Sequence, residues 1–143
     1  ILADVNTIIT ETWAASEYDL TGMANHILIP PQQYAYLVGT KVSEAGNISI
    51  LQFLLDNNIG KNQGVDLVIA PSRWCAGAGT GGTDRMVAYV NDEDRVNFDL
   101  TVPLSRVMTQ PQVTEMAYLT AYAAQIGQVK FLYTQCARYG DGI

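Results

Sequence analysis

The sequence predicts an α+β fold, in which a mixed or antiparallel sheet is flanked by helices. Three observations lead to this class. Apolar residues recur at helical spacing in the first 60 residues, short apolar runs end at prolines, and the stretch "RVNFDLTVP" (95–103) alternates strictly between apolar and polar side chains. The 143 residues are enough for one compact domain. We therefore expect a single core with helices packed on a sheet.

The first half of the chain predicts three helices and two strands. Asp4 is the expected cap of a helix over 4–16, "HILIP" (26–30) is a short buried strand, and Pro31 suits the first turn of a helix that ends at Gly39. "NISILQFLLDNN" (47–58) predicts a helix capped by Asn47 or Ser49. The stretch "NNIGKNQG" is expected to break the chain before a strand at "VDLVIAP" (65–71). The apolar stripes of the first and third helices share helical spacing and comprise Val5, Ile8, Ile9 and Trp13, and Ile50, Leu51, Leu54 and Leu55.

The second half predicts strands. The residues 86–90 and 95–102 are expected to form a hairpin around the polar turn "NDED". The segment 104–115, which contains Pro111, is expected to be irregular. Residues 116–139 are expected to form two extended runs that turn at Gly127.

The composition argues against several classes of function. The chain has a net charge of −6, and its three lysines and five arginines are scattered, so we expect no specific binding to nucleic acid. No apolar run approaches the length of a membrane span, which predicts no membrane contact. Only 15% of the residues are charged, which suggests that part of the surface faces protein. Cys75 and Cys136 are expected to be free thiols, although their pairing stays open. Because the chain starts with Ile just before a helix, we expect a fragment of a longer polypeptide.

The glycine-rich stretch "GAGTGGTDRMVAYV" (77–90) is the strongest candidate for a ligand site. Gly77, Gly79 and Gly82 match G-x-G-x-x-G, which binds dinucleotides when a strand precedes it and a helix follows it. The residues after Gly82 are β-branched and aromatic, and no Lys-Ser/Thr pair completes a phosphate loop. We therefore favour a loop between two strands. A small-molecule or nucleotide-binding enzyme domain that uses Gly77–Gly82 stays as the alternative.

The remaining candidates for chemistry are weaker. "NDED" lacks the spacing of a calcium loop, and His26 is the only histidine, so neither a metal site nor a Ser-His-Asp arrangement is indicated. We expect no catalytic residues, no cofactor and no metal. Trp74, beside the glycine-rich stretch, could anchor that loop or contact a neighbouring molecule.

The order of these pieces resembles a known family. The stretches "NHILIPPQQYAYL", "SILQFLLDNN", "GAGTGGTDRMVAYVNDEDRVNFDLTVPL" and the closing "ARYGDGI" together resemble the C-terminal half of major capsid proteins of tailed bacteriophages and prophages, which have the Johnson (Hong Kong phage-type) fold. The resemblance spans most of the chain and is weakest over 107–115. It implies an axial-type domain over 1–102, with residues 103–143 returning to a peripheral-type domain, unless the whole chain is one compact domain.

The resemblance also implies a function. It predicts a structural subunit, not an enzyme, that assembles into the icosahedral shell enclosing phage DNA. Its partners would be other copies of itself in pentamers and hexamers, with a scaffold or a maturation protease as further candidates and no small-molecule substrate. The shell would be assembled in the bacterial host cytoplasm and form the virion capsid. A tail or decoration protein of a phage is a third alternative.

We expect the subunit contacts to involve the glycine loop and the acidic turn. Gly permits several backbone shapes in non-identical surroundings, and Arg85 and Arg95 could pair across subunits with the acidic residues 92–94. The candidate interface residues are Trp74, Gly77, Gly79, Gly81, Gly82, Arg85, Asp92, Glu93, Asp94 and Arg95.

Overall fold

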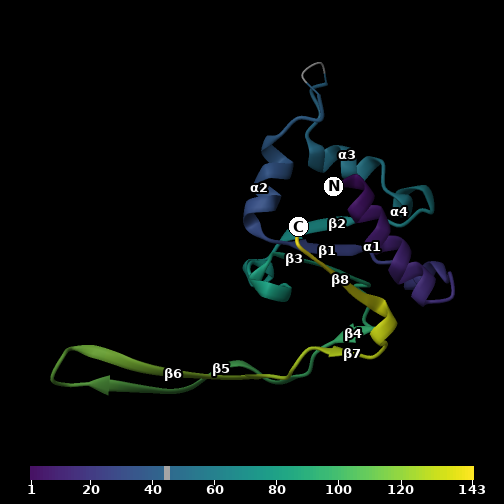
Figure 1. Ribbon diagram of the computed structural model, residues 1–143. Coiled ribbons are helices and arrows are strands. Elements are labelled where there is room, and N and C mark those ends of the chain that lie inside the picture. The colour runs from purple at the N-terminus through teal and green to yellow at the C-terminus, as the bar shows by residue number, and fades with distance from the viewer. Residues whose placement is uncertain (44–45) are drawn as a thin grey trace.

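The computed structural model describes residues 1–43 and 46–143, and it consists of a compact body from which a long two-stranded arm projects (Figure 1). The fold is α+β, as the sequence predicts. Its helices are α1 (Leu2–Ala15), α2 (Pro31–Gly39), α3 (Ile50–Asp56) and α4 (Ile59–Asn62). Its strands are β1 (His26–Ile29), β2 (Val68–Pro71), β3 (Arg85–Tyr89), β4 (Val96–Asn97), β5 (Leu100–Gln112), β6 (Ala117–Ile126), β7 (Lys130–Phe131) and β8 (Ala137–Asp141).

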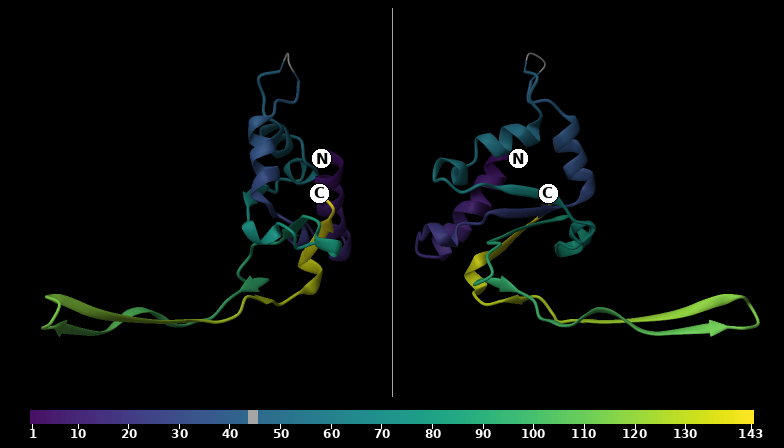
Figure 2. Two further views of the ribbon diagram at one scale, coloured as in Figure 1. Left: turned by 60° about the vertical axis from the view of Figure 1, so that its left-hand side comes forward. Right: turned by 180° about the vertical axis from the view of Figure 1, so that it is seen from behind.

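The body is built on a four-stranded mixed sheet in the order β2-β1-β3-β8. β1 is parallel to β2 and antiparallel to β3, and β3 is antiparallel to β8. The helices lie together on one side of this sheet, and the arm leaves on the other side (Figures 1 and 2). Strand β8 returns from the far end of the sequence, so the body contains residues from both sides of position 102.

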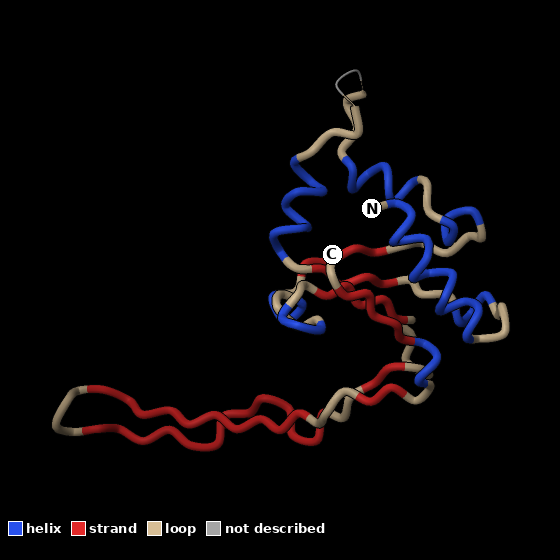
Figure 3. Tube along the Cα trace, in the orientation of Figure 1, coloured by secondary structure: helices blue, strands red, loops and turns tan. Residues whose placement is uncertain are grey.

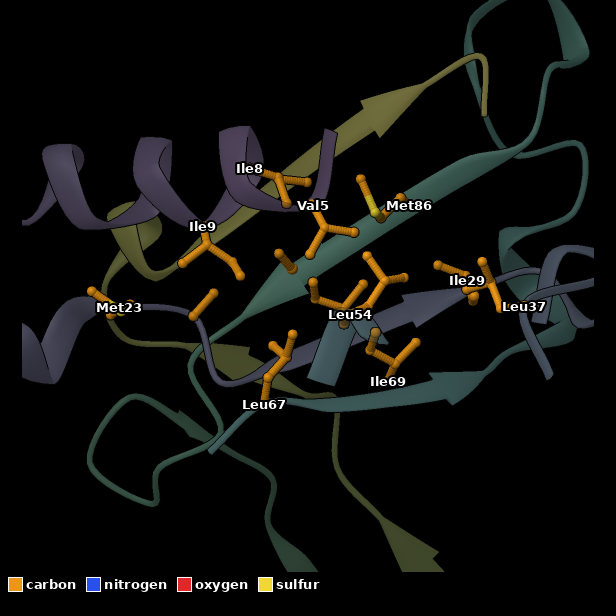
Figure 4. Close-up of a cluster of buried hydrophobic side chains, with 13 residues drawn as sticks. Val5, Ile8, Ile9, Met23, Ile29, Leu37, Leu54, Leu67, Ile69 and Met86 are labelled. Carbon is orange, nitrogen blue, oxygen red and sulfur yellow. The ribbon is translucent and has the colours of Figure 1, made fainter. Parts of the chain in front are cut away.

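The core lies between the sheet and the helices (Figure 4). Alternate residues of β1 and β3 point into it, and Ile27, Ile29, Met86 and Ala88 are all buried. The helices α1, α2 and α3 supply apolar side chains from the other side. The fully or nearly buried members from the helices are Val5, Ile8, Ile9, Leu37 and Leu54.

The helix signals in the sequence are largely confirmed. Pro31 is the first residue of α2, and the Ser49 side chain caps α3 by accepting a hydrogen bond from the Gln52 backbone N–H. The prediction for Asp4 was wrong, because α1 begins at Leu2 and Asp4 lies inside its first turn. The expected break at "NNIGKNQG" contains the short helix α4, which the buried Asn58 side chain caps.

The arm is an antiparallel ribbon of β5 and β6 that extends well beyond the body (Figure 3). The irregular segment expected over 104–115 was wrong, since residues 100–112 form one continuous strand. Pro111 is accommodated because an edge strand does not need every N–H for pairing. A second small ladder, β4 with β7, joins the arm to the body.

Both hairpins predicted from the sequence were wrong. The strand over 85–89 pairs with β1 and β8, not with residues 95–102, and that second run is itself divided into β4 and β5. Gly127 does not join a strand pair, because β6 before it pairs with β5 and β7 after it pairs with β4. Each extended run was recognised, but period-two alternation shows only which face a strand buries and says nothing of which distant strand it pairs with.

Candidate interaction surfaces

Trp74 is an exposed aromatic residue on a 3₁₀ turn between β2 and β3. Its side chain is 74% exposed, and the Arg73 guanidinium carbon lies 4.4 Å from the centre of the indole ring. The next residue, Cys75, is buried and anchors the turn. The indole therefore stands on the surface with a cation stacked on it, an arrangement common at protein contacts.

The glycine loop that follows is tied down by two aspartates. The Gly77 N–H donates to Asp84 Oδ1 at 3.0 Å, and both the backbone N–H and the hydroxyl of Thr80 donate to Asp141 Oδ2 at 3.0 Å. The Gly79 N–H also donates to the Thr83 carbonyl at 2.7 Å. This loop has a defined shape held by its own chain. Positive φ angles, which favour glycine, occur at Gly77, Gly81 and Gly82.

The chain after the glycines is extended, as the sequence predicts. A single 3₁₀ turn, Thr80–Gly82, separates the loop from β3, which starts at Arg85. A dinucleotide site would need a helix here, because the pyrophosphate rests on the helix N-terminus. The glycine pattern therefore lacks the element that would bind phosphate.

Arg85 pairs with Asp141 inside the chain. Its Nε donates to Oδ1 at 2.6 Å and its Nη2 donates to Oδ2 at 3.0 Å, and the guanidinium carbon lies 4.7 Å from the Tyr139 ring centre. The Arg85 hydrogen bonds, and then that from the Thr80 backbone, hold the pKa of Asp141 well below its usual range. The hydrogen bond to Asp141 raises the pKa of Arg85. The two carboxylate oxygens thus join the last strand to the glycine loop.

The acidic turn 92–94 lies at the other end of β3. Its backbone is closed by Asp92, whose carbonyl accepts from the N–H groups of Arg95 and Val96 at 3.0 and 2.8 Å. The Asp92 side chain also accepts from the Asp94 N–H at 3.3 Å. All three acidic residues are exposed. The turn therefore presents carboxylates to solvent from a hydrogen-bonded backbone.

Arg95 is held by residues far away in the sequence. Its guanidinium donates to the Thr21 hydroxyl at 2.5 Å and to the Cys136 sulfur at 3.1 Å, and its carbonyl accepts from the Leu132 N–H at 2.9 Å. The hydrogen bond to Cys136 raises the pKa of Arg95. Cys75 and Cys136 are both free and buried.

The structure divides the predicted site residues into two groups. The glycine loop, Trp74 and Arg85 lie at the start of β3, and the acidic turn and Arg95 follow its end. A strand of five residues separates them, which spans about 17 Å. Arg85 forms an ion pair with Asp141, and the Arg95 guanidinium is hydrogen-bonded to Thr21 and Cys136 of its own chain. Among the candidate interface residues, the exposed carboxylates of the acidic turn are therefore the charges most open to a neighbouring subunit.

The arm is a further candidate interaction surface that was not predicted from the sequence. Within residues 100–126 the only charged residues are Arg106 and Glu115. Large apolar side chains are exposed along the whole ribbon and at its tip, where Met116 is 100% exposed. The alternation in "AYLTAYAAQI" was recognised as a strand. Both faces of that strand are uncharged, and this lack of charge was the signal in the sequence that could have indicated an interaction surface. The exposed residues are Leu100, Leu104, Val107, Met108, Val113, Met116, Tyr118, Leu119, Tyr122 and Ile126.

A groove of about 600 Å³ lies between α1, α2 and β8. Aliphatic residues such as Val5, Ile8 and Leu37 line it together with acidic residues such as Glu11, and none of the residues 77–82 reaches it. It therefore offers no support for a nucleotide site built on the glycines. In the part of the chain that the structure describes, no helix is both long and apolar enough to cross a bilayer, and no cluster of three potential metal ligands occurs.

Comparison with known proteins identifies a family and a similar fold. The family model described as major capsid protein matches residues 1–143. The capsid of Myoviridae Phage XM1 matches in structure with a TM-score of 0.73 and 18% identity, over 99% of this chain and 45% of that one. This chain thus spans less than half the length of its structural relative. No curated protein matches it. The fold is that of a phage capsid protein, and the chain belongs to the major capsid protein family.

Proposed function

We propose that this protein is a structural subunit that assembles with copies of itself into the shell around phage DNA. The observation that carries the proposal is the arm, which exposes large apolar side chains along both of its strands and has only two charged residues. A two-stranded ribbon of this kind is marginal in water unless another surface covers it. Membership of the major capsid protein family supports other subunits as that surface.

The two parts of the molecule suit different roles in a shell. We assign the axial-type role to the body and the peripheral-type role to the arm. The pairing of β8 with β3 supports placing residues 137–141 with the body, so that the peripheral part is residues 100–126 and not all of 103–143. The body would then present its loops to capsomer centres while the arm reaches neighbouring subunits.

The candidate contacts on the body are the two separate groups. Trp74 and the glycine loop form one, and the acidic turn forms the other. Each contact is modest, but a closed ring of identical subunits multiplies weak contacts through effective concentration. Pentamers and hexamers of the full-length protein are the assemblies we expect. The acidic net charge of −6 suits a container that does not grip packed DNA.

The role is structural, without substrate, cofactor or catalysis. Location in the virion follows from it, with assembly in the bacterial host cytoplasm and help from a scaffold or a maturation protease as further parts of the proposal. The alternative of a nucleotide enzyme gains no support from the strand that follows Gly82.

Electron microscopy tests the proposal. The full-length protein, produced together with its scaffold, is expected to form closed shells. Tubes would favour a tail protein, and isolated particles with no closed assembly would contradict the shell role. Calorimetry with ATP and NAD addresses the enzyme alternative, since micromolar binding that Gly79→Ala abolishes would support it.

A further inference from the structure

The two long edges of the arm are built differently. All three register shifts in the ladder insert the extra residue in β5, between Leu100 and Val102, Val102 and Ser105, and Arg106 and Met108. β5 also contains Pro103 and Pro111, which have no N–H. Bulges and prolines are the devices that keep a free strand edge from pairing with another chain. The β5 edge is therefore blocked.

The β6 edge has none of these devices. Its ten residues, Ala117–Ile126, follow one another without a register shift and contain no proline, glycine or charge. Apart from the half-buried Thr120, the residues along it are exposed, with Tyr118 at 76% and Tyr122 at 63%. A long, regular, uncharged edge of this kind is a template for another strand.

The direction of the β6 backbone groups follows from the ladder. Pro111 lies opposite Tyr118, and since it has no N–H to donate to β6, this pair is not hydrogen-bonded. The N–H and C=O of Tyr118, and of every second residue after it, then point away from β5. The hydrogen bond from the Gly127 N–H to the Asp99 carbonyl, at 2.7 Å, agrees with this, because odd-numbered residues face β5. The outward residues are Tyr118, Thr120, Tyr122, Ala124 and Ile126.

We propose that β6 pairs antiparallel with β6 of a second copy of this chain, so that two arms form one four-stranded sheet around a two-fold axis. The proposal deepens the shell function and rests on it. Identical edges meet in a two-fold contact, so any charge on β6 would lie close to its own copy, and β6 has none.

The geometry allows this pairing over the whole strand. In this register Tyr122 lies opposite Tyr122 of the second copy, and Tyr118 lies opposite Ile126. Every residue whose backbone N–H and C=O point away from β5 then lies opposite such a residue of the second copy. The arm is long and thin with the body at one end (Figure 2). Two antiparallel arms therefore place the two bodies at opposite ends, where they do not collide. The shared ladder would run for about 33 Å.

A pair of matched proline variants tests the proposal. Thr120 on β6 and Thr109 on β5 lie directly opposite each other, and both point their N–H away from the ladder between the strands. Thr120→Pro removes a donor from the open edge, and Thr109→Pro removes one from the blocked edge. Sedimentation of the chain up to about 1 mM is expected to show a dimer for the wild type and Thr109→Pro, and at least a ~10-fold weaker dimer for Thr120→Pro.

A second measurement does not depend on proline. Tyr122→Cys should form a disulfide-linked dimer on mild oxidation, since paired Cα atoms about 5.5 Å apart suit a disulfide. Arg106→Cys, opposite Tyr122 on β5, should not. A wild-type chain that stays monomeric, equal effects of the two prolines, or equal crosslinking of the two cysteines would each overturn the inference.

The shell assay keeps the two proposals separate. If full-length Thr120→Pro forms shells as readily as the wild type, the strand pairing is wrong and the shell function stands. If the wild type forms no shells, the shell function fails, whatever the sedimentation of the isolated chain shows.

Discussion

Gly79 is required by space rather than by backbone angle. Its φ is −78°, which any residue can adopt, but a Cβ there would lie 2.5 Å from Thr83 Oγ1 and 2.8 Å from the Thr83 carbonyl oxygen. We expect Gly79→Ala to lower the free energy of unfolding by about 1–3 kcal/mol, because the loop must shift to accept the methyl group. Urea denaturation measures this.

The control for that substitution is Gly39→Ala. Gly39 is the last residue of α2, and nothing lies within 4 Å of an added Cβ. Alanine should there be neutral or stabilising by up to about 1 kcal/mol. Equal losses of stability in the two variants would show that the crowding around Gly79 is not what selects glycine.

Asp141 should make stability depend on pH. Its pKa is lowered in the folded chain, so its contribution is complete above the unfolded value of about 3.9 and is lost as the pH falls below it. We therefore expect Asp141→Asn to lower the melting temperature at pH 7 and to differ less from the wild type at pH 3. Arg85→Gln removes the partner of this carboxylate, so its difference in melting temperature from the wild type should also be smaller at pH 3 than at pH 7. If the difference in melting temperature between each variant and the wild type stays constant from pH 7 to pH 3, the Asp141 carboxylate is not the source of the pH dependence.

At the residue scale, the sequence indicated which side chains take part in polar contacts more readily than it indicated their partners. Arg85 and Arg95 were expected to pair across subunits with the acidic residues 92–94, and that pairing stays a prediction. The partners in the structure are Asp141, Thr21 and Cys136, which lie 56, 74 and 41 positions away. No local pattern encodes such separations, because they follow from how β3, β4 and β8 are arranged.

At the scale of elements, Asn58 joins two helices. Its side chain is fully buried, donates to the carbonyls of Leu54 and Leu55 at 3.0 and 2.8 Å, and accepts from the Lys61 N–H at 2.8 Å. It therefore closes the end of α3 and caps α4. We expect Asn58→Ala to cost about 1–3 kcal/mol in urea denaturation, since buried backbone groups lose their partner.

The neighbouring residue is the natural comparison. Asn57 also donates to a backbone carbonyl, that of Phe53 at 2.9 Å, but it is exposed and water can replace it. Asn57→Ala should change stability by no more than about 0.5 kcal/mol. If the two alanine variants behave alike, burial does not set the importance of Asn58.

Helices were easier to predict than strand pairing for a physical reason. The start of α2 at Pro31 and the cap of α3 at Ser49 depend on residues within one turn of each other. The partners of β3 are at positions 26–28 and 137–141, far from it on both sides. A turn-like "NDED" between two alternating runs favours a hairpin locally, but the body gains more from closing its sheet with β8.

At the scale of the whole molecule, the shape separates folding from assembly. The core lies entirely between the four-stranded sheet and the helices, and the arm contributes nothing to it. The family could be identified from the order of motifs in the body. The arm could not be foreseen, because its apolar side chains are exposed on both strands and leave no pattern of burial in the sequence. Substitutions on the arm and the acidic turn should thus affect assembly more than stability.

The acidic turn gives the clearest test of this separation. Glu93 and Asp94 are exposed, whereas the Asp92 side chain helps to close the turn, so Glu93→Lys with Asp94→Lys reverses the charge and leaves the backbone contacts of Asp92 in place. Stability of the chain should change by no more than about 0.5 kcal/mol, and the yield of closed shells should fall, because the carboxylates meet neighbouring subunits in our proposal. Glu11→Lys with Glu17→Lys makes the same change in net charge at two exposed residues in and just after α1, and neither residue has an ion pair in the described part of the chain. Normal shells from the 93/94 variant would remove the acidic turn from the interface, and equal losses from both variants would mean that net charge, rather than this turn, governs assembly.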